Sequence, residues 1–162
     1  MYLLNKAIKM SCCVPYFFSS SSRAMSYLDD INYENTVPFI PPVKYGKVIK
    51  VYDGDTITLA SKILNGTEIY RFSVRLNGID SPEIKGKSEA EKKSAMKSRD
   101  ALKKLILNKC VTLYDVKTEK YGRILAEVYL DGLHINKWML ENKLAEPYDG
   151  GTKKKFEDFY KD

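Results

Sequence analysis

Val74-Arg75-Leu76-Asn77-Gly78-Ile79-Asp80-Ser81-Pro82-Glu83 joins the end of a predicted β-strand to a stiff, acidic loop. Over residues 70–77, apolar and polar side chains alternate, which is the pattern of a strand with one buried face. Arg75 falls on the polar side of this pattern, so we expect it to point away from the apolar face. Pro82 fixes its own φ and favours extended geometry at Ser81. The sequence therefore predicts that a guanidinium and two carboxylates converge near one strand end.

These side chains suit chemistry on a phosphate. A carboxylate such as Asp80 can hold a hard divalent cation, and a second one, such as Glu83, can orient or deprotonate water. The guanidinium of Arg75 can grip phosphate oxygens through paired hydrogen bonds. The alternative is an exposed ion pair between the arginine and the acids, which would contribute little.

Composition sets the outer bounds. The chain has 162 residues, of which 44% are hydrophobic and 30% charged, as expected for one compact domain with a core. A net charge of +6 is compatible with nucleic acid, an anionic membrane or no charged partner. The 3 cysteines show no disulfide or zinc spacing, and the single histidine, His134, argues against an imidazole-based catalytic dyad.

Residues 1–40 differ in composition from residues 41–162, which we predict to be the folded domain. No acidic residue precedes Asp29, and residues 19–22 are serines. This composition is typical of an organelle transit peptide or, over residues 10–18, of a weak secretory signal; a disordered leader of a soluble intracellular protein is the alternative. No apolar run is long enough to span a bilayer, so no stable membrane span is expected.

Alternation and turn residues predict five strands in the domain. They are placed at residues 46–52, 55–59, 70–77, 111–117 and 124–130. A helix is predicted between the third and fourth strands, and this order is that of an OB-type barrel. The predicted fold class is therefore a five-stranded OB-fold β-barrel with two to three helices (α+β).

The long helix begins with a capping box, Ser88 and Glu91, and apolar residues recur at helical spacing through Leu107. Its lysines are interpreted as a solvated surface, with nucleic-acid contact as the alternative. Asn136 is expected to cap a second, short helix. Residues 153–160 are compatible with a third, amphipathic helix.

Three short motifs occur in a fixed order within this plan of strands and helices. They are Asp53-Gly54-Asp55-Thr56, then Arg75 with Asp80-Ser81-Pro82-Glu83, then Lys120-Tyr121-Gly122-Arg123. Asp53-Gly54 predicts a hairpin turn, and residues 119–123 are expected to form another, in which Gly122 permits a tight or left-handed conformation. Each motif alone is weak, but the ordered set is hard to obtain by chance. Over about residues 47–148 the chain resembles the staphylococcal nuclease (thermonuclease, SNase-like) family.

The resemblance implies a role for particular residues. Asp55, Asp80 and the main-chain carbonyl of Ser81 are implied to be the metal ligands that bind Ca²⁺. Catalysis is implied for Arg75, Glu83 and Arg123, and substrate binding for Lys120, Tyr121 and Tyr148. The family further implies a monomer that hydrolyses DNA or RNA, with a preference for unpaired strands, to 5′-hydroxyl and 3′-phosphate ends. Because no base-reading motif is present, we expect little sequence specificity.

Two other functions fit parts of the same pattern. A catalytically silent OB-fold module would also use positive charge and tyrosines to bind nucleic acid. A small OB domain whose acids bind Ca²⁺ only for stability is the second. The complete set of acids and arginines favours the enzyme, because converging carboxylates would repel the anionic backbone that a pure binding module must hold.

Overall fold

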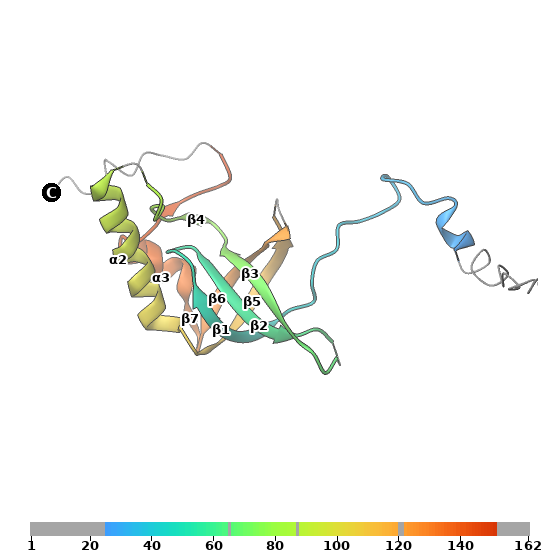
Figure 1. Cartoon of the computed structure of the whole chain (residues 1–162), viewed down its shortest axis with the longest axis horizontal. Coiled ribbons are helices and arrows are strands. Elements are labelled where there is room, and N and C mark those ends of the chain that lie inside the picture. The colour runs from blue at the N-terminus through green and yellow to red at the C-terminus, as the bar shows by residue number, and fades with distance from the viewer. Residues whose placement is uncertain (1–24, 65, 87, 120–121, 152–162) are drawn as a thin grey trace, which may run out of the picture. The chain divides into compact units, whose positions relative to one another are not determined.

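The computed structural model describes residues 25–64, 66–86, 88–119 and 122–151. The chain divides into two units, Met1–Val37 and Pro38–Asp162. The described part of the first unit contains a short 3-10 helix, η1 (Ser26–Leu28), with no buried residue. The helices and strands described below belong to the second unit (Figure 1). In the described ranges, no helix is both long enough and apolar enough to cross a membrane.

Five strands of the second unit close into a barrel. The strands among the described residues are β1 (Tyr45–Val51), β2 (Thr56–Lys62), β3 (Ile69–Leu76), β4 (Ile79–Asp80), β5 (Cys110–Thr118), β6 (Ile124–Leu130), β7 (Leu133–His134) and β8 (Glu146–Pro147). β1, β2 and β3 form an antiparallel meander, β5 joins β1 to β6, and parallel pairing of β3 with β6 closes the barrel. β7 extends β6, while β4 pairs with β8 in a separate small sheet. The predicted five-stranded barrel with helices is confirmed.

Burial along β3 does not follow the alternation that predicted the strand. Val74, Arg75 and Leu76 are all buried at its end, whereas Tyr70 near its start is 47% exposed. The difference follows from pairing: residues 74–76 lie between β2 and β6, while the first residues of β3 pair with β2. The start of β3 therefore lies at the edge of the core and the end of β3 lies inside it.

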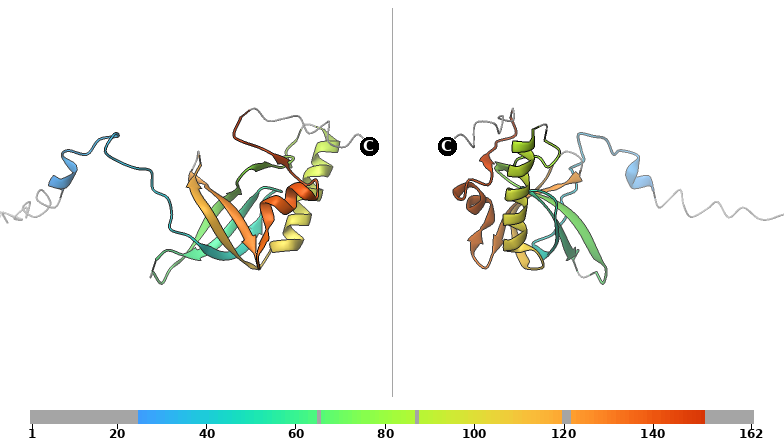
Figure 2. Two further views of the ribbon diagram at one scale, coloured as in Figure 1. Left: turned by 180° about the vertical axis from the view of Figure 1, so that it is seen from behind. Right: turned by 60° about the vertical axis from the view of Figure 1, so that its left-hand side comes forward.

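Helix α2 (Glu89–Ile106) starts as predicted. The Ser88 hydroxyl accepts a hydrogen bond from the Glu91 amide at 3.1 Å, as in a capping box. One face of the helix packs on the barrel, and its buried residues are Ser94, Ala95, Ser98, Leu102 and Ile106. Figure 2 shows α2 and α3 on the same side of the barrel.

Helix α3 (Ile135–Glu141) does not use Asn136 as its N-cap, so that prediction is wrong. His134 occupies the cap position, and Asn136 lies inside the helix, 2% exposed. Its amide oxygen accepts from the Val128 N–H at 2.9 Å, and its amide nitrogen donates to the Asn77 carbonyl at 2.8 Å. These long-range bonds tie β6 to the turn between β3 and β4. The third predicted helix, at residues 153–160, lies outside the described residues.

Candidate functional site

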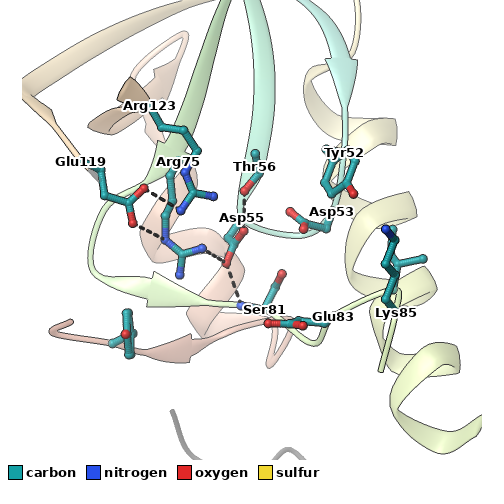
Figure 3. Close-up of a pocket in the computed structure, with 12 residues that line it drawn as sticks. Tyr52, Asp53, Asp55, Thr56, Arg75, Ser81, Glu83, Lys85, Glu119 and Arg123 are labelled. Atoms are coloured by element: carbon teal, nitrogen blue, oxygen red, sulfur yellow. Dashed lines mark hydrogen bonds and ion pairs between the residues drawn. The ribbon is translucent and has the colours of Figure 1, made fainter. Parts of the chain in front are cut away.

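A cavity of about 310 Å³ lies where three connections of the barrel meet. These connections are the β1–β2 turn, the loop after β4 and the β5–β6 turn. Among its lining residues are Asp55, Arg75, Ser81, Glu83, Arg123 and Tyr148. The structure thus brings together most of the site residues predicted from the sequence, and Figure 3 shows the labelled side chains of Asp55, Arg75, Ser81, Glu83 and Arg123 around one space.

The remaining predicted residues fall in two groups. Asp80 is buried at 4% exposure and does not line the cavity; its carboxylate faces Arg75 instead. Lys120 and Tyr121 lie outside the described residues. The structure therefore gives no account of the predicted contacts of Lys120 and Tyr121 with substrate.

Arg75 is the centre of a buried charge cluster. Its Nη1 lies 2.8 Å from Asp55 Oδ2 and its Nη2 lies 2.7 Å from Asp80 Oδ1. Nη2 also donates to the Ile79 carbonyl at 3.2 Å. The side chain is 9% exposed, so the interpretation as an exposed ion pair is wrong. Burial alone would lower the pKa of Arg75, but the neighbouring carboxylates, Asp55 first, outweigh it and raise the pKa above the ordinary value.

Asp55 is fixed by its local sequence. The Thr56 hydroxyl donates to Asp55 Oδ1 at 2.8 Å, and the Ser81 amide donates to Oδ2 at 3.2 Å. Gly54 lets this turn approach α2, because a Cβ at that position would overlap the Ser98 hydroxyl. The Asp-Gly-Asp-Thr motif thus places one carboxylate against Arg75 and Ser81 at the same time.

Asp53, at the start of the same motif, has an unusual pKa. Burial and the nearby Asp55 carboxylate raise the pKa of Asp53 to about 7. Its Oδ1 is buried and has no hydrogen-bond partner among the described residues. A carboxylate in this state favours a proton or a cation, so Asp53 joins the site although its sequence position suggested only a turn.

The β5–β6 turn supplies a second arginine and an acid that holds it. Two main-chain hydrogen bonds close the turn: the Glu119 amide donates to the Arg123 carbonyl at 2.8 Å, and the Gly122 amide donates to the Glu119 carbonyl at 3.2 Å. Gly122 has a positive φ of 72°, as predicted. Arg123 Nη2 lies 2.7 Å from Glu119 Oε2, and Arg75 Nε lies 3.9 Å from Glu119 Oε1. Glu119 therefore connects the two arginines, as the dashed lines in Figure 3 show.

Glu83 and Tyr148 complete the lining from two other segments. Glu83 is exposed and follows β4, in a turn closed by a 2.8 Å bond from the Gly86 amide to the Glu83 carbonyl. The Tyr148 ring lies 5.7 Å from Arg75 Cζ, in cation–π contact. Tyr148 thus packs on one of the two arginines.

The donors around the cavity fit a hard cation such as Ca²⁺. They are carboxylate, carbonyl and hydroxyl oxygens, which Ca²⁺ prefers in flexible geometry. Two of them, Asp53 Oδ1 and Ser81 Oγ, are buried without a hydrogen-bond partner in the described part of the chain. No three acidic, histidine or cysteine side chains of the described residues converge into a metal cluster. A cation here would therefore need main-chain, water or phosphate oxygens besides the carboxylates.

Sequence reasoning missed Asp53 and Glu119 as site residues. Asp53 stands inside the first recognised motif and Glu119 directly precedes the third, but each was assigned to a turn. Glu119 could have been identified from its position four residues before Arg123. The two residues flank one hairpin turn, so their side chains are expected at the same end of the sheet. For Asp53, no sequence signal distinguishes a turn aspartate from a buried one.

Comparison with known proteins gives the family. Residues 73–161 match the family model described as staphylococcal nuclease homologue. The chain is 34% identical to an uncharacterized endonuclease of Escherichia coli, over 65% of this chain and 61% of that protein. It is 29% identical to an uncharacterized protein of Methanocaldococcus jannaschii, over 90% of this chain and 80% of that protein. It is 33% identical to a staphylococcal-like nuclease of Arabidopsis thaliana, over 48% of this chain and 22% of that protein.

The chain thus spans less than two thirds of the length of the bacterial and plant relatives. The family model covers more than half of the chain, including the second half of β3, the acidic loop, α2 and the β5–β6 turn. These segments carry both arginines, Ser81 and Glu83. The chain belongs to the staphylococcal nuclease homologue family.

Proposed function

We propose that this chain is a nuclease that hydrolyses phosphodiester bonds of DNA or RNA with little sequence specificity. The observation that carries the proposal is the shared cavity, where Arg75 and Arg123 face the same space as Glu83 and Ser81. A phosphodiester is anionic and resists attack, so its hydrolysis needs charge neutralisation, a positioned water and stabilisation of the extra charge at phosphorus.

The two arginines are proposed to hold the phosphate oxygens. Arg75 would do so in exchange for part of its present contact with Asp55 and Asp80, whereas Arg123 has a donor in reserve. Arg123 Nε is buried and lacks a hydrogen-bond partner within the described ranges. A buried donor of this kind favours a ligand oxygen, because unsatisfied polar groups are costly. Arginine suits the task better than lysine because its planar fork can donate two parallel bonds to one phosphate.

Glu83 is proposed to act on the attacking water, either by accepting its proton or by orienting it. Its exposed carboxylate lines the same cavity as Arg75 and Arg123. Asp55, Asp80 and the Ser81 carbonyl are proposed to hold Ca²⁺, with Asp53 as a further carboxylate. When bound, the cation would neutralise phosphate charge. Products with 5′-hydroxyl and 3′-phosphate ends are part of the proposal.

A cleavage assay on the full-length chain tests this function. Single-stranded DNA and RNA are incubated with Ca²⁺, with Mg²⁺ or with a chelator, and Glu83→Gln is compared with Glu141→Gln, an exposed carboxylate on α3. We expect cleavage that requires Ca²⁺ and falls about a hundred-fold or more in Glu83→Gln, with no loss in the control. Binding without cleavage in any metal would refute catalysis and leave a nucleic-acid-binding module.

A further inference from the structure

A second hollow continues from the cavity onto the outer face of the barrel. Its volume is about 250 Å³, and Tyr52, Asp53, Thr56 and Arg123 line both spaces. Thr58 of β2 and Ser73 of β3 line the hollow but not the cavity. The cavity is therefore open toward the outward side chains of these strands.

The strand register extends this path into successive rows. Three rows of cross-strand neighbours lead away from the site: Thr56–Arg75, then Lys50–Thr58–Ser73, then Lys47–Ala60–Arg71. Residues two apart on a strand share a face, so each row lies roughly 6.7 Å beyond the last. The residues between the rows, such as Ile57 and Leu59, are fully buried in the core. The rows thus form one outward surface that begins at Arg75.

This surface is basic. Lys47, Lys50 and Arg71 are exposed, and the next pair along the strands, Lys62 with Ile69, adds another exposed cation. On the described outer face of β1 to β3, these rows contain no aspartate or glutamate. Positive charge without interspersed acids matches a polyanion.

An aromatic ring stands where the surface meets the cavity. Tyr52 is 51% exposed, and Lys50 Nζ lies 5.7 Å from the centre of its ring. Single-strand binding proteins combine aromatic rings, on which bases stack, with cations that follow the backbone. The ring and the adjacent lysine present this combination beside the hollow.

We propose that the surface formed by Lys47, Lys50, Thr58, Arg71 and Ser73, here called the basic strand face, binds a single-stranded nucleic acid beyond the phosphate held in the cavity. The inference rests on the proposed nuclease function and adds a path for the substrate. It implies that a long single strand is a better substrate than a dinucleotide, because the long strand reaches cations two rows from the cavity.

The test uses the full-length chain and the double variant Lys47→Gln/Arg71→Gln. The matched control is Lys103→Gln/Lys104→Gln, which removes the same charge from exposed residues in the last turn of α2. For each protein, kcat/KM is measured on a long single-stranded oligonucleotide and on a dinucleotide. We expect the ratio of the two to fall about ten-fold in the first variant only. The slope of log affinity against log salt should become shallower by about 1.4, or 0.7 for each lost phosphate contact.

An equal loss in the control would refute the proposal, because net charge would then explain the effect. An unchanged ratio in Lys47→Gln/Arg71→Gln, or tighter binding of duplex than of single strand, would also refute it. If the wild-type chain cleaves nothing, the proposed nuclease function fails by itself. Fluorescence anisotropy with the same oligonucleotide then still tests the basic strand face: weaker binding in the first variant alone supports it, and equal binding refutes it.

Discussion

Arg75 and Arg123 line one cavity but lie in different surroundings. Arg75 is almost fully buried and is held by Asp55 and Asp80 at hydrogen-bonding distance. The side chain of Arg123 is 32% exposed, pairs with Glu119 and has a buried Nε without a partner in the described part of the chain. One guanidinium therefore neutralises the protein's own carboxylates, while the other keeps a donor available for a ligand.

The difference separates structural from chemical contributions at the site. A buried charge network leaves an uncompensated charge when one partner is removed, so its residues are costly to change whatever their role in catalysis. A partly exposed ion pair contributes little to stability. We therefore expect replacement of Arg75 to affect folding and activity together, and replacement of Arg123 to affect activity alone.

The largest expected effect is the loss of stability in Arg75→Gln. This change leaves Asp55 and Asp80 buried without their cation, which should lower the free energy of unfolding by about 3–5 kcal/mol. Urea unfolding followed by the fluorescence of Trp138, the single tryptophan, measures the loss in the presence of a chelator. Arg99→Gln is the matched control, because Arg99 pairs with Asp100 at 2.8 Å on the surface of α2. A loss as small as that of the control would show that the buried carboxylates do not depend on Arg75.

The next effect concerns the other arginine. Arg123→Lys keeps the positive charge but removes the fork and the Nε donor, so kcat should fall about a hundred-fold. The free energy of unfolding should change by less than about 1 kcal/mol, because the pair with Glu119 is partly exposed. Cleavage rates and urea unfolding of the same sample give both values. A large loss of stability, or an unchanged kcat, would contradict the expectation that Arg123, unlike Arg75, contributes to activity and not to stability.

The sequence predicted the parts of this site that local patterns determine. The strand that carries Arg75 follows from the alternation of apolar and polar residues, although the burial of Arg75 does not, and the Ser88 cap follows from its spacing to Glu91. Gly122 was recognised as a turn residue and has a positive φ. In each case the interaction that fixes the residue lies within a few positions along the chain, where period and turn chemistry are informative.

The missed features depend on contacts between distant segments. Asn136 has the side chain of a helix cap, but it bonds to Asn77, 59 positions away. Such a bond exists only after β6 has paired with β3, and no local preference encodes it. Glu119 was not assigned a role from the sequence, and only the closed turn sets it between two arginines. Tertiary context decided both residues.

Glu119→Gln tests whether the link between the two arginines matters. The amide can still accept a hydrogen bond but no longer forms the 2.7 Å ion pair with Arg123, so the guanidinium should be held less firmly. We expect kcat to fall about ten-fold, equivalent to about 1.4 kcal/mol. KM should not rise, because the cavity loses a negative charge. A rise in KM with an unchanged kcat would instead indicate that Glu119 contacts the substrate.

The smallest expected effect is a change in pH dependence at Asp53. Its folded-state pKa, raised to about 7 from an ordinary value of 3.8, means that the folded chain holds a proton that the unfolded chain has released. Stability should therefore fall as pH rises from about 4 to 7 in the presence of a chelator. Asp53→Asn should remove this decline and increase stability at neutral pH by at most about 1–2 kcal/mol, since the group is partly solvated. Urea unfolding at several pH values measures the slope. If the variant keeps the wild-type slope, another group causes the decline, and the repulsion between Asp53 and Asp55 is already relieved without a cation.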